Sequence, residues 1–167
     1  MKKEELDNIL KSMCNKLETI EFNERSVGRE FFQQLAIISA EPDICSYIIN
    51  KMKEESIPYL DEVLVILVRD GEILLTEKEI VNLTTVPTTI YSQEDFIDCI
   101  IDSVGDKLQK TTIKKIVKNF GSDCDFCSSY LDLLWSNIIE EEDMEIKRKK
   151  RIIYEEAKEW FFEKQWI

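Results

Sequence analysis

Histidine is absent from all 167 positions of this sequence. Without an imidazole, the chain cannot build a Ser–His–Asp triad, a Cys–His catalytic pair or a histidine-ligated metal site. It also lacks a glycine-rich loop of the kind that holds phosphate groups. These absences exclude several large classes of enzyme. We therefore expect a protein that is not an enzyme and that uses neither a metal nor a cofactor.

Turn-forming residues are scarce, with 4 glycines and 3 prolines. A many-stranded β fold needs more turns than this, so the composition favours helices. No stretch approaches the ~18 consecutive apolar residues that indicate a membrane span. The first residues, MKKEELDNIL, become acidic before any apolar run, which is not the pattern of a signal peptide. We expect a helical, cytoplasmic protein that does not bind membranes.

The five cysteines are an odd number scattered along the chain, unlike the disulfide framework of a small secreted protein. Cys124 and Cys127 form the one CxxC motif. A zinc site would need two further ligands, and a thioredoxin-type site would need a strand before the pair. We expect reduced structural thiols. An enzyme that uses this pair, or a pair of carboxylates, is the alternative.

The formal net charge is −12. A nucleic-acid-binding surface would show a basic footprint, and an anionic membrane would repel so acidic a protein. The same charge can attract a basic molecule over a long range. The sequence therefore predicts a basic protein as the partner, with no direct contact to nucleic acid.

The most apolar stretch is Ile57–Leu75, in which six apolar residues run from Val63 to Val68. Such a run belongs in a core. As a helix it would begin at Pro58 and end at a left-handed Gly71. As a hairpin it would pair two strands at 63–68 and 72–75 around an Asp-Gly turn. We predict the buried helix, because an isolated hairpin is marginally stable and the flanking sequence reads as helical.

Apolar residues at spacings of three and four predict helices over most of the remaining chain. The ranges are about 2–20, 25–40, 42–55, 92–104, 111–120, 123–138 and 145–164. Thr76 with Glu79 forms a capping box that begins a short helix, and residues 84–90 read as a loop. In the last helix, Ile152, Ile153 and Ala157 are predicted to share a buried side. The sequence thus predicts an all-α fold, a single domain over 1–167 that is an antiparallel helical bundle or a short helical array. An α+β fold with a hairpin at 63–75 is the alternative.

Charged residues are gathered in blocks of one sign. One acidic stripe recurs at helical spacing opposite an apolar face, and a second acidic block precedes the unbroken basic run 147–151. Such blocks are either solvated helix faces or recognition surfaces for a basic partner. The candidate interaction residues in them are Asp95, Asp98, Asp102, Asp106, Glu140, Glu141, Glu142 and Asp143.

The C-terminal sequence KEWFFEKQWI is rich in aromatic residues. Trp160 fits the buried face of the last helix, whereas Phe162 and Trp166 fall away from it. Aromatic residues are over-represented at the centres of interfaces, so these three complete the set of interaction candidates. A tail that folds back onto the body is the alternative.

One resemblance lies within residues 130–166. The stretch YLDLLWSNIIEEEDM, followed by AKEWFFEKQW, resembles the end of the HEAT-type W2 domain of translation initiation factors. Those domains carry acidic and aromatic boxes near their C-terminus and bind basic partner segments. The chain departs from the pattern in lacking a tryptophan soon after the acidic box and an acidic run at its end. The resemblance implies an adaptor domain of a larger assembly.

The negative charge, the small size and the missing catalytic motifs together lead to the first functional hypothesis, which is an acidic protein–protein interaction module. Its predicted class is a small inhibitor or immunity-type protein that covers a basic surface of a protein partner. The alternatives are the W2-like adaptor and an enzyme of unrecognised type.

Overall fold

A computed structural model describes residues 1–19, 28–71, 73–93, 95–96, 99–100, 111–112, 115, 118–119 and 125–165. Seven helices can be delimited in these ranges: α1 (Lys3–Thr19), α2 (Gly28–Ser39), α3 (Ile44–Glu54), α4 (Leu60–Asp70), α5 (Glu77–Leu83), α8 (Asp125–Glu140) and α9 (Met144–Gln165). The described part of the chain contains no strand. The all-α prediction is confirmed.

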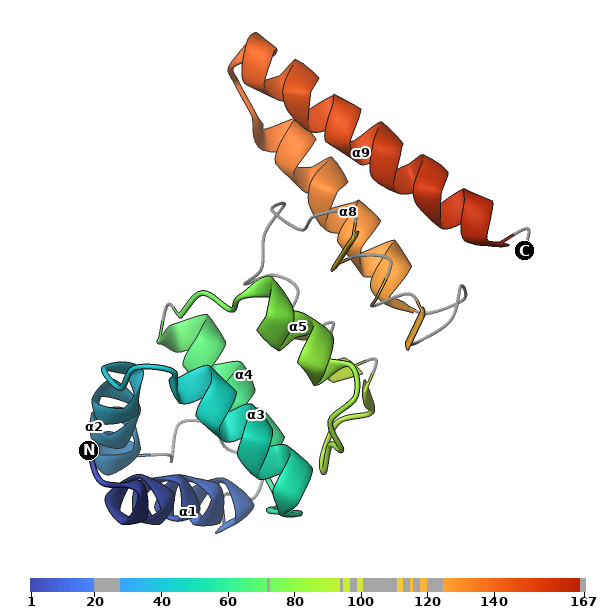
Figure 1. Cartoon of the computed structure of the whole chain (residues 1–167). Helices are drawn as coiled ribbons and strands as arrows, with labels where there is room; N and C mark the ends of the chain where they lie inside the picture. The colour runs from blue at the N-terminus through green and yellow to red at the C-terminus, as the bar shows by residue number, and fades with distance from the viewer. Residues whose placement is uncertain are drawn as a thin grey trace.

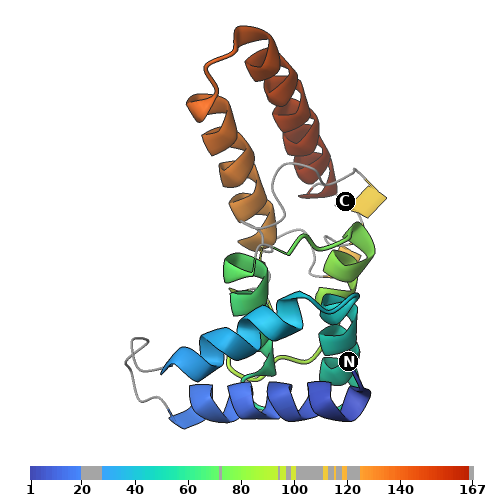
Figure 2. The same cartoon turned by 90° about the vertical axis from the view of Figure 1, so that its left-hand side faces the viewer.

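The helices fall into two groups (Figure 1). Helices α1 to α5 form a body, in which α1 packs against α2 and α4 while α3 packs against α4 and α5. Helices α8 and α9 lie side by side and antiparallel, forming a hairpin that extends from the body (Figure 2). Tyr130, Leu134 and Ala157 of this hairpin belong to the same hydrophobic core as the body. Among the helices described, none has the length and apolarity needed to cross a membrane.

Helix α4 is the centre of the body. All six apolar residues from Val63 to Val68 are buried, the most exposed of them at only 8%. A helix can bury every face only when other elements surround it, and α1 and α3 both pack against α4. Burial of each such side chain contributes about 1.5–3 kcal/mol. The predicted core position is confirmed, and the alternative hairpin at 63–75 is wrong because residues 60–70 are helical.

Both predicted boundaries of α4 need correction. The helix begins after Tyr59 rather than at Pro58, and Tyr59 has a left-handed backbone with φ 70°. Gly71 ends the helix with φ −82°, so it is not the left-handed residue that we predicted. A glycine is required there for space instead: a Cβ would lie 2.4 Å from the carbonyl oxygen of Leu67 and 2.9 Å from Ser39 Oγ.

The predicted helices at 2–20, 25–40 and 42–55 are confirmed within the described residues, as α1, α2 and α3. Helix α3 begins at Ile44, so Pro42 lies in the turn before it. The capping box of α5 is present as predicted. Thr76 Oγ1 accepts from the N–H of Glu79 at 3.2 Å, and Glu79 Oε1 accepts from the N–H of Thr76 at 2.9 Å.

The segments after α5 are described in part. Residues 84–90 contain no helix, as predicted. Ser92 Oγ accepts from the N–H of Asp95 at 3.2 Å, which begins the next helical turns, and Phe96 and Ile100 are buried. Of the helices predicted at 92–104, 111–120 and 123–138, residues 94, 97–98, 101–104, 113–114, 116–117, 120 and 123–124 lie outside the described residues.

The α8–α9 hairpin packs through one row of side chains from each helix. Tyr130, Leu134 and Ile138 of α8 are buried, and Ala157 of α9 is buried with Tyr154 partly covered. The predicted inward face of α9 is partly wrong, because Ile152 is 51% exposed and Ile153 is 42% exposed. In a helix of 3.6 residues per turn, a face centred on 154 and 157 turns residue 152 to the opposite side.

Candidate interaction surface

The acidic turn at the end of the hairpin is held by its own side chains. Glu141 Oε2 accepts from Lys150 Nζ at 2.8 Å, and this hydrogen bond lowers the pKa of Glu141. Asp143 Oδ1 caps α9 by accepting from the N–H groups of Glu145 and Ile146 at 3.0 and 3.1 Å. Two of the four acidic residues predicted as interaction candidates therefore shape the turn.

Glu140 and Glu142 are the other two, and both are exposed. Within the described ranges, neither carboxylate forms an ion pair. They flank the turn on its two sides, one at the end of α8 and one before α9. A partner could therefore bind these two carboxylates without breaking a contact that holds the turn of the hairpin together.

Two exposed apolar side chains lie in the last turns of α8, before this acidic turn. Trp135 is 43% exposed and Ile139 is 62% exposed. They are four residues apart, so they lie one above the other on the same face of the helix. The Trp135 ring packs against Tyr154 of α9, with ring centroids 5.3 Å apart and planes inclined by 50°. Trp135 is thus fixed on one side and open to solvent on the other.

Trp135 and Ile139 were not among the interaction residues predicted from the sequence. The sequence pattern that could have predicted them is the presence of apolar residues on more than one face of α8, beyond the row at 130, 134 and 138. An all-round apolar helix is expected in a buried position, and α8 contacts chiefly α9. The surplus apolar face is consequently exposed.

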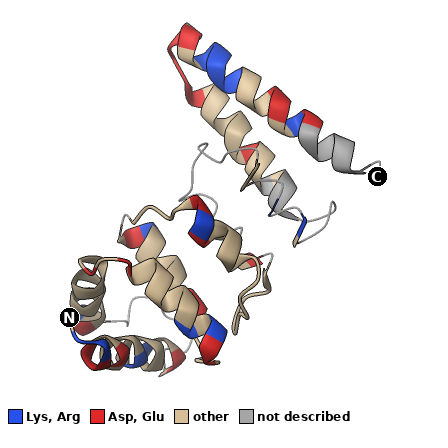
Figure 3. Ribbon diagram, in the orientation of Figure 1, with Lys and Arg blue, Asp and Glu red and all other residues tan. Residues whose placement is uncertain are grey.

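The basic run 147–151 begins three residues into α9, shortly after the acidic turn (Figure 3). Lys150 is bound to Glu141, whereas Arg148, Lys149 and Arg151 are exposed. The end of the hairpin therefore carries both signs of charge within a short distance.

Only part of the predicted candidate set can be placed. Asp95 is exposed at the start of a helical turn. Asp98, Asp102 and Asp106, the rest of the predicted acidic stripe, lie outside the described residues, as do Trp166 and the side chains of Trp160 and Phe162. Those parts of the interaction surface stay predictions.

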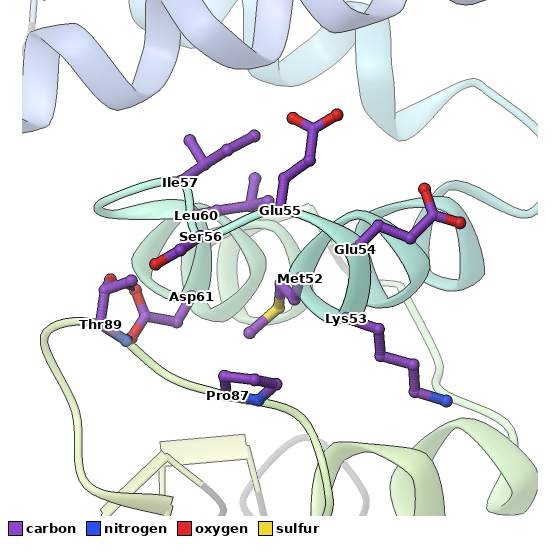
Figure 4. A pocket seen from close by; sticks show the side chains of 10 residues that line it. All are labelled: Met52, Lys53, Glu54, Glu55, Ser56, Ile57, Leu60, Asp61, Pro87 and Thr89. Carbon is purple, nitrogen blue, oxygen red and sulfur yellow. Dashed lines mark hydrogen bonds between the residues drawn. The ribbon is translucent and has the colours of Figure 1, made fainter.

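A cavity of about 220 Å³ lies in the body, beneath the connection from α3 to α4. Figure 4 shows Met52 and Pro87 near its centre and Asp61 directed towards Thr89. The charged ends of Lys53, Glu54 and Glu55 point outward in different directions. They do not converge on one point, as the groups of a catalytic site would have to.

Asp61, the one carboxylate buried in this cavity wall, is 1% exposed and fully engaged. Its Oδ2 accepts from the N–H groups of Thr89, Ile90 and Tyr91 at 2.9, 3.0 and 3.3 Å. Its Oδ1 accepts from the Thr89 hydroxyl at 2.8 Å and from the N–H of Glu62 at 3.1 Å. Asp61 therefore serves to hold the 84–91 loop on the start of α4.

A second polar cluster joins α1 to α3. Lys51 Nζ lies 3.0 Å from Asp7 Oδ2, and the Tyr47 hydroxyl donates to Asp7 Oδ1. Burial, with the bond to Asp7, raises the pKa of Tyr47 to about 12. The hydrogen bond to Asp7 raises the pKa of Lys51. All three groups keep their ordinary charge near neutral pH, so the cluster is a structural link between helices.

The thiols of Cys14 and Cys45 are free and buried. Burial raises the pKa of each to about 12, with Asp61 adding to the effect at Cys14 and Glu79 at Cys45. Such thiols are protonated at neutral pH and are poor nucleophiles. The thiols of the CxxC pair lie outside the described side chains. Among the residues described, no group of three or more Cys, Asp or Glu side chains is placed to hold a metal.

Comparison with protein families, with curated proteins and with solved structures finds no match to this chain. The resemblance of residues 130–166 to the W2 domain accordingly stays a prediction.

Proposed function

We propose that this protein is a non-enzymatic interaction module that binds a basic surface of a partner protein. The binding surface is the α8 face, defined as Trp135, Ile139, Glu140 and Glu142. The observation that carries the proposal is the exposure of Trp135 and Ile139, at 43% and 62%, one helical turn apart. Glu140 and Glu142 follow Ile139 closely in sequence, are exposed and form no ion pair within the described residues.

The centre of the α8 face is apolar. Tryptophan is among the residues that contribute most to binding energy, typically where it fills a pocket at the middle of an interface. The contact with Tyr154 holds the Trp135 ring in place before binding. Less side-chain freedom is therefore lost on association, which favours affinity.

The edge of the α8 face is acidic. Glu140 and Glu142 would lie at the rim of an interface centred on Ile139, where charges act mainly by speeding association. The net charge of −12 extends this attraction over the whole molecule. A basic protein surface with an apolar pocket is the complement of this arrangement. A small inhibitor or immunity-type protein has this mode of action.

The test begins with the full chain as bait in an extract of its source cell. We expect one basic protein to be retained in stoichiometric amount. The affinity of that purified protein is then compared between the parent and Trp135→Ala, for which we expect a loss of about 2 kcal/mol or more, typical of a central aromatic residue. Leu74→Ala is the matched control, because Leu74 is 76% exposed and belongs to the segment between α4 and α5, not to the hairpin.

The rim is tested separately with Glu140→Gln and Glu142→Gln in one chain. The expected result is slower association that depends less on salt, with little change in dissociation. If Trp135→Ala binds the partner as tightly as Leu74→Ala does, the α8 face is not the binding surface. Catalytic activity of the purified chain towards any substrate would contradict the proposal that the protein is not an enzyme.

A further inference from the structure

The outer face of α9 carries a regular pattern that the proposed function does not use. It is opposite the side occupied by Tyr154 and Ala157, which contacts α8. Ile152 lies at its middle and is 51% exposed. The exposed residues around it, at spacings of three, four and seven, are Glu145, Arg148, Lys149, Glu155, Glu156 and Glu159.

Within one helical turn of Ile152, the charge on this outer face changes sign. The residues before it, Arg148 and Lys149, are basic, and the residues after it, Glu155 and Glu156, are acidic. Across the ranges that the structure describes, none of these four forms an ion pair. The face therefore presents an exposed apolar residue between two unpaired blocks of opposite charge.

A second copy of the same helix complements this pattern. When two identical helices pack antiparallel with residue 152 at the centre, a residue a given number of positions before 152 lies at the level of the residue the same number after it. Arg148 and Lys149 then lie at the level of Glu155 and Glu156 of the second copy, with Arg148 on the same side of the contact as Glu155 and Lys149 on the same side as Glu156. A two-fold axis repeats both pairs, as in an isologous dimer. Glu145 and Glu159 would oppose each other about 10 Å from the centre, at the solvated ends.

Other partners fit the outer face less well. A nucleic acid or an anionic lipid surface would be attracted by Arg148 and repelled by Glu155 and Glu156. A uniformly basic protein would be attracted by Glu155 and Glu156 and repelled by Arg148. Like charges opposed across an interface are costly, so the occupant has to carry both signs in the reverse order.

We propose that this protein forms a homodimer through the outer face of α9, packed antiparallel about Ile152. One helix from each copy gives a contact smaller than the ~1,200–2,000 Å² of a standard interface. The dimer therefore exchanges with the monomer at accessible concentrations, and salt weakens it because its ion pairs are at the surface. The α8 face is not used, so the dimer can present two copies of it.

Analytical ultracentrifugation of the full chain over a range of concentrations, at low and high salt, measures this equilibrium. We expect a monomer–dimer equilibrium at low salt that shifts towards monomer at high salt. Ile152→Glu should abolish the dimer while the circular dichroism spectrum stays helical. Leu74→Glu, a control at an even more exposed apolar position outside the hairpin, should leave the dimer unchanged. A chain that is monomeric at every concentration, or a dimer that survives Ile152→Glu, overturns the proposal.

Charge reversal tests the antiparallel pairing itself. One variant carries Arg148→Glu and Lys149→Glu, and the other carries Glu155→Lys and Glu156→Lys. Each alone should dimerise at least tenfold more weakly than the parent, as expected for at least ~1.4 kcal/mol of charge repulsion. Mixing the two should restore a heterodimer, and the chain with all four changes should dimerise like the parent. Failure of both restorations would show that the helices do not pair in this register.

Discussion

The carboxylate of Asp61 binds both the backbone N–H and the hydroxyl of Thr89, two groups of a residue 28 positions further along the chain. This single carboxylate joins the start of the central helix to a loop that has no regular structure. Within the described part of the chain, the groups that donate to this carboxylate are backbone N–H groups and one hydroxyl, and none is a basic side chain. The loop N–H groups therefore compensate the buried charge.

Asp61→Asn should therefore destabilise the protein. The amide keeps one acceptor oxygen and places an NH₂ group against N–H donors, so buried donors lose their partner. We expect a loss of about 1–3 kcal/mol in the free energy of unfolding, measured by urea denaturation. Asp70→Asn, the same change at the exposed end of α4, is the control and should cost much less. Equal effects at the two sites would contradict the structural role of Asp61.

Gly71→Ala should also destabilise the fold, for a steric reason. The new Cβ would lie 2.4 Å from the Leu67 carbonyl oxygen and 2.9 Å from Ser39 Oγ. Forcing these atoms apart is expected to cost about 1–3 kcal/mol in unfolding experiments. Ser39→Ala removes one of the two obstructing atoms, so the double variant should lose less than the sum of the two single losses. Strict additivity would mean that Ser39 does not limit the space at Gly71.

The cluster around Asp7 predicts a pH dependence. Burial pushes the pKa of Asp7 up, but the hydrogen bonds from Tyr47 and Lys51 outweigh it and lower the pKa below the ordinary 3.8. The resulting stabilisation is present above pH 3.8 and is lost as the pH falls through the lowered pKa. Lys51 has a pKa raised above 10.5, so its share is present below pH 10.5 and is lost as the pH rises through the raised value.

Asp7→Asn tests this pH dependence. Near neutral pH we expect the variant to be less stable than the parent by about 1–2 kcal/mol, allowing for the partial exposure of the group. The difference should shrink as the pH falls from 3.8 through the lowered pKa of Asp7, because the parent carboxylate becomes protonated over that range. Glu5→Gln, an exposed change on the same helix, should show no such pH-dependent difference. If the difference in the free energy of unfolding between Asp7→Asn and the parent does not change with pH, the ion pair is not its cause.

Thr76→Ala should shorten or loosen α5. The change removes the hydroxyl that accepts from the Glu79 N–H, and N-cap substitutions of this kind cost about 1 kcal/mol. The loss is measurable by thermal unfolding. Lys78→Ala, at an exposed position of the same first turn, is the control and should change stability by only a few tenths of a kcal/mol. If both substitutions cost the same, the capping box contributes nothing.

Helix locations could be predicted because they depend on local patterns. Leu6, Leu10 and Met13 repeat at helical spacing and are all buried, and the capping box at Thr76 is a signal four residues long. Even the central run was predictable, since six apolar residues in a row leave no face for solvent. Residues close in the chain determine such features.

The candidate site was less predictable because it depends on which helix covers which face. Ile152 and Ile153 fit an inward apolar row by sequence, yet α8 covers the side of α9 that carries Tyr154 and Ala157. Trp135 is exposed because no described helix other than α9 packs extensively against α8. The contact between Asp61 and Thr89 likewise joins residues that no local pattern relates.

Because Asp61 binds the N–H groups of Thr89, Ile90 and Tyr91, the protection of these amides from hydrogen exchange is tied to α4. A loop of this kind would ordinarily exchange by small local fluctuations. Here the amides are released only when the start of the most deeply buried helix separates from the loop. Ile90 and Tyr91 should thus exchange on the slow timescale of the core, and a segment without regular structure reports on the opening of the whole body.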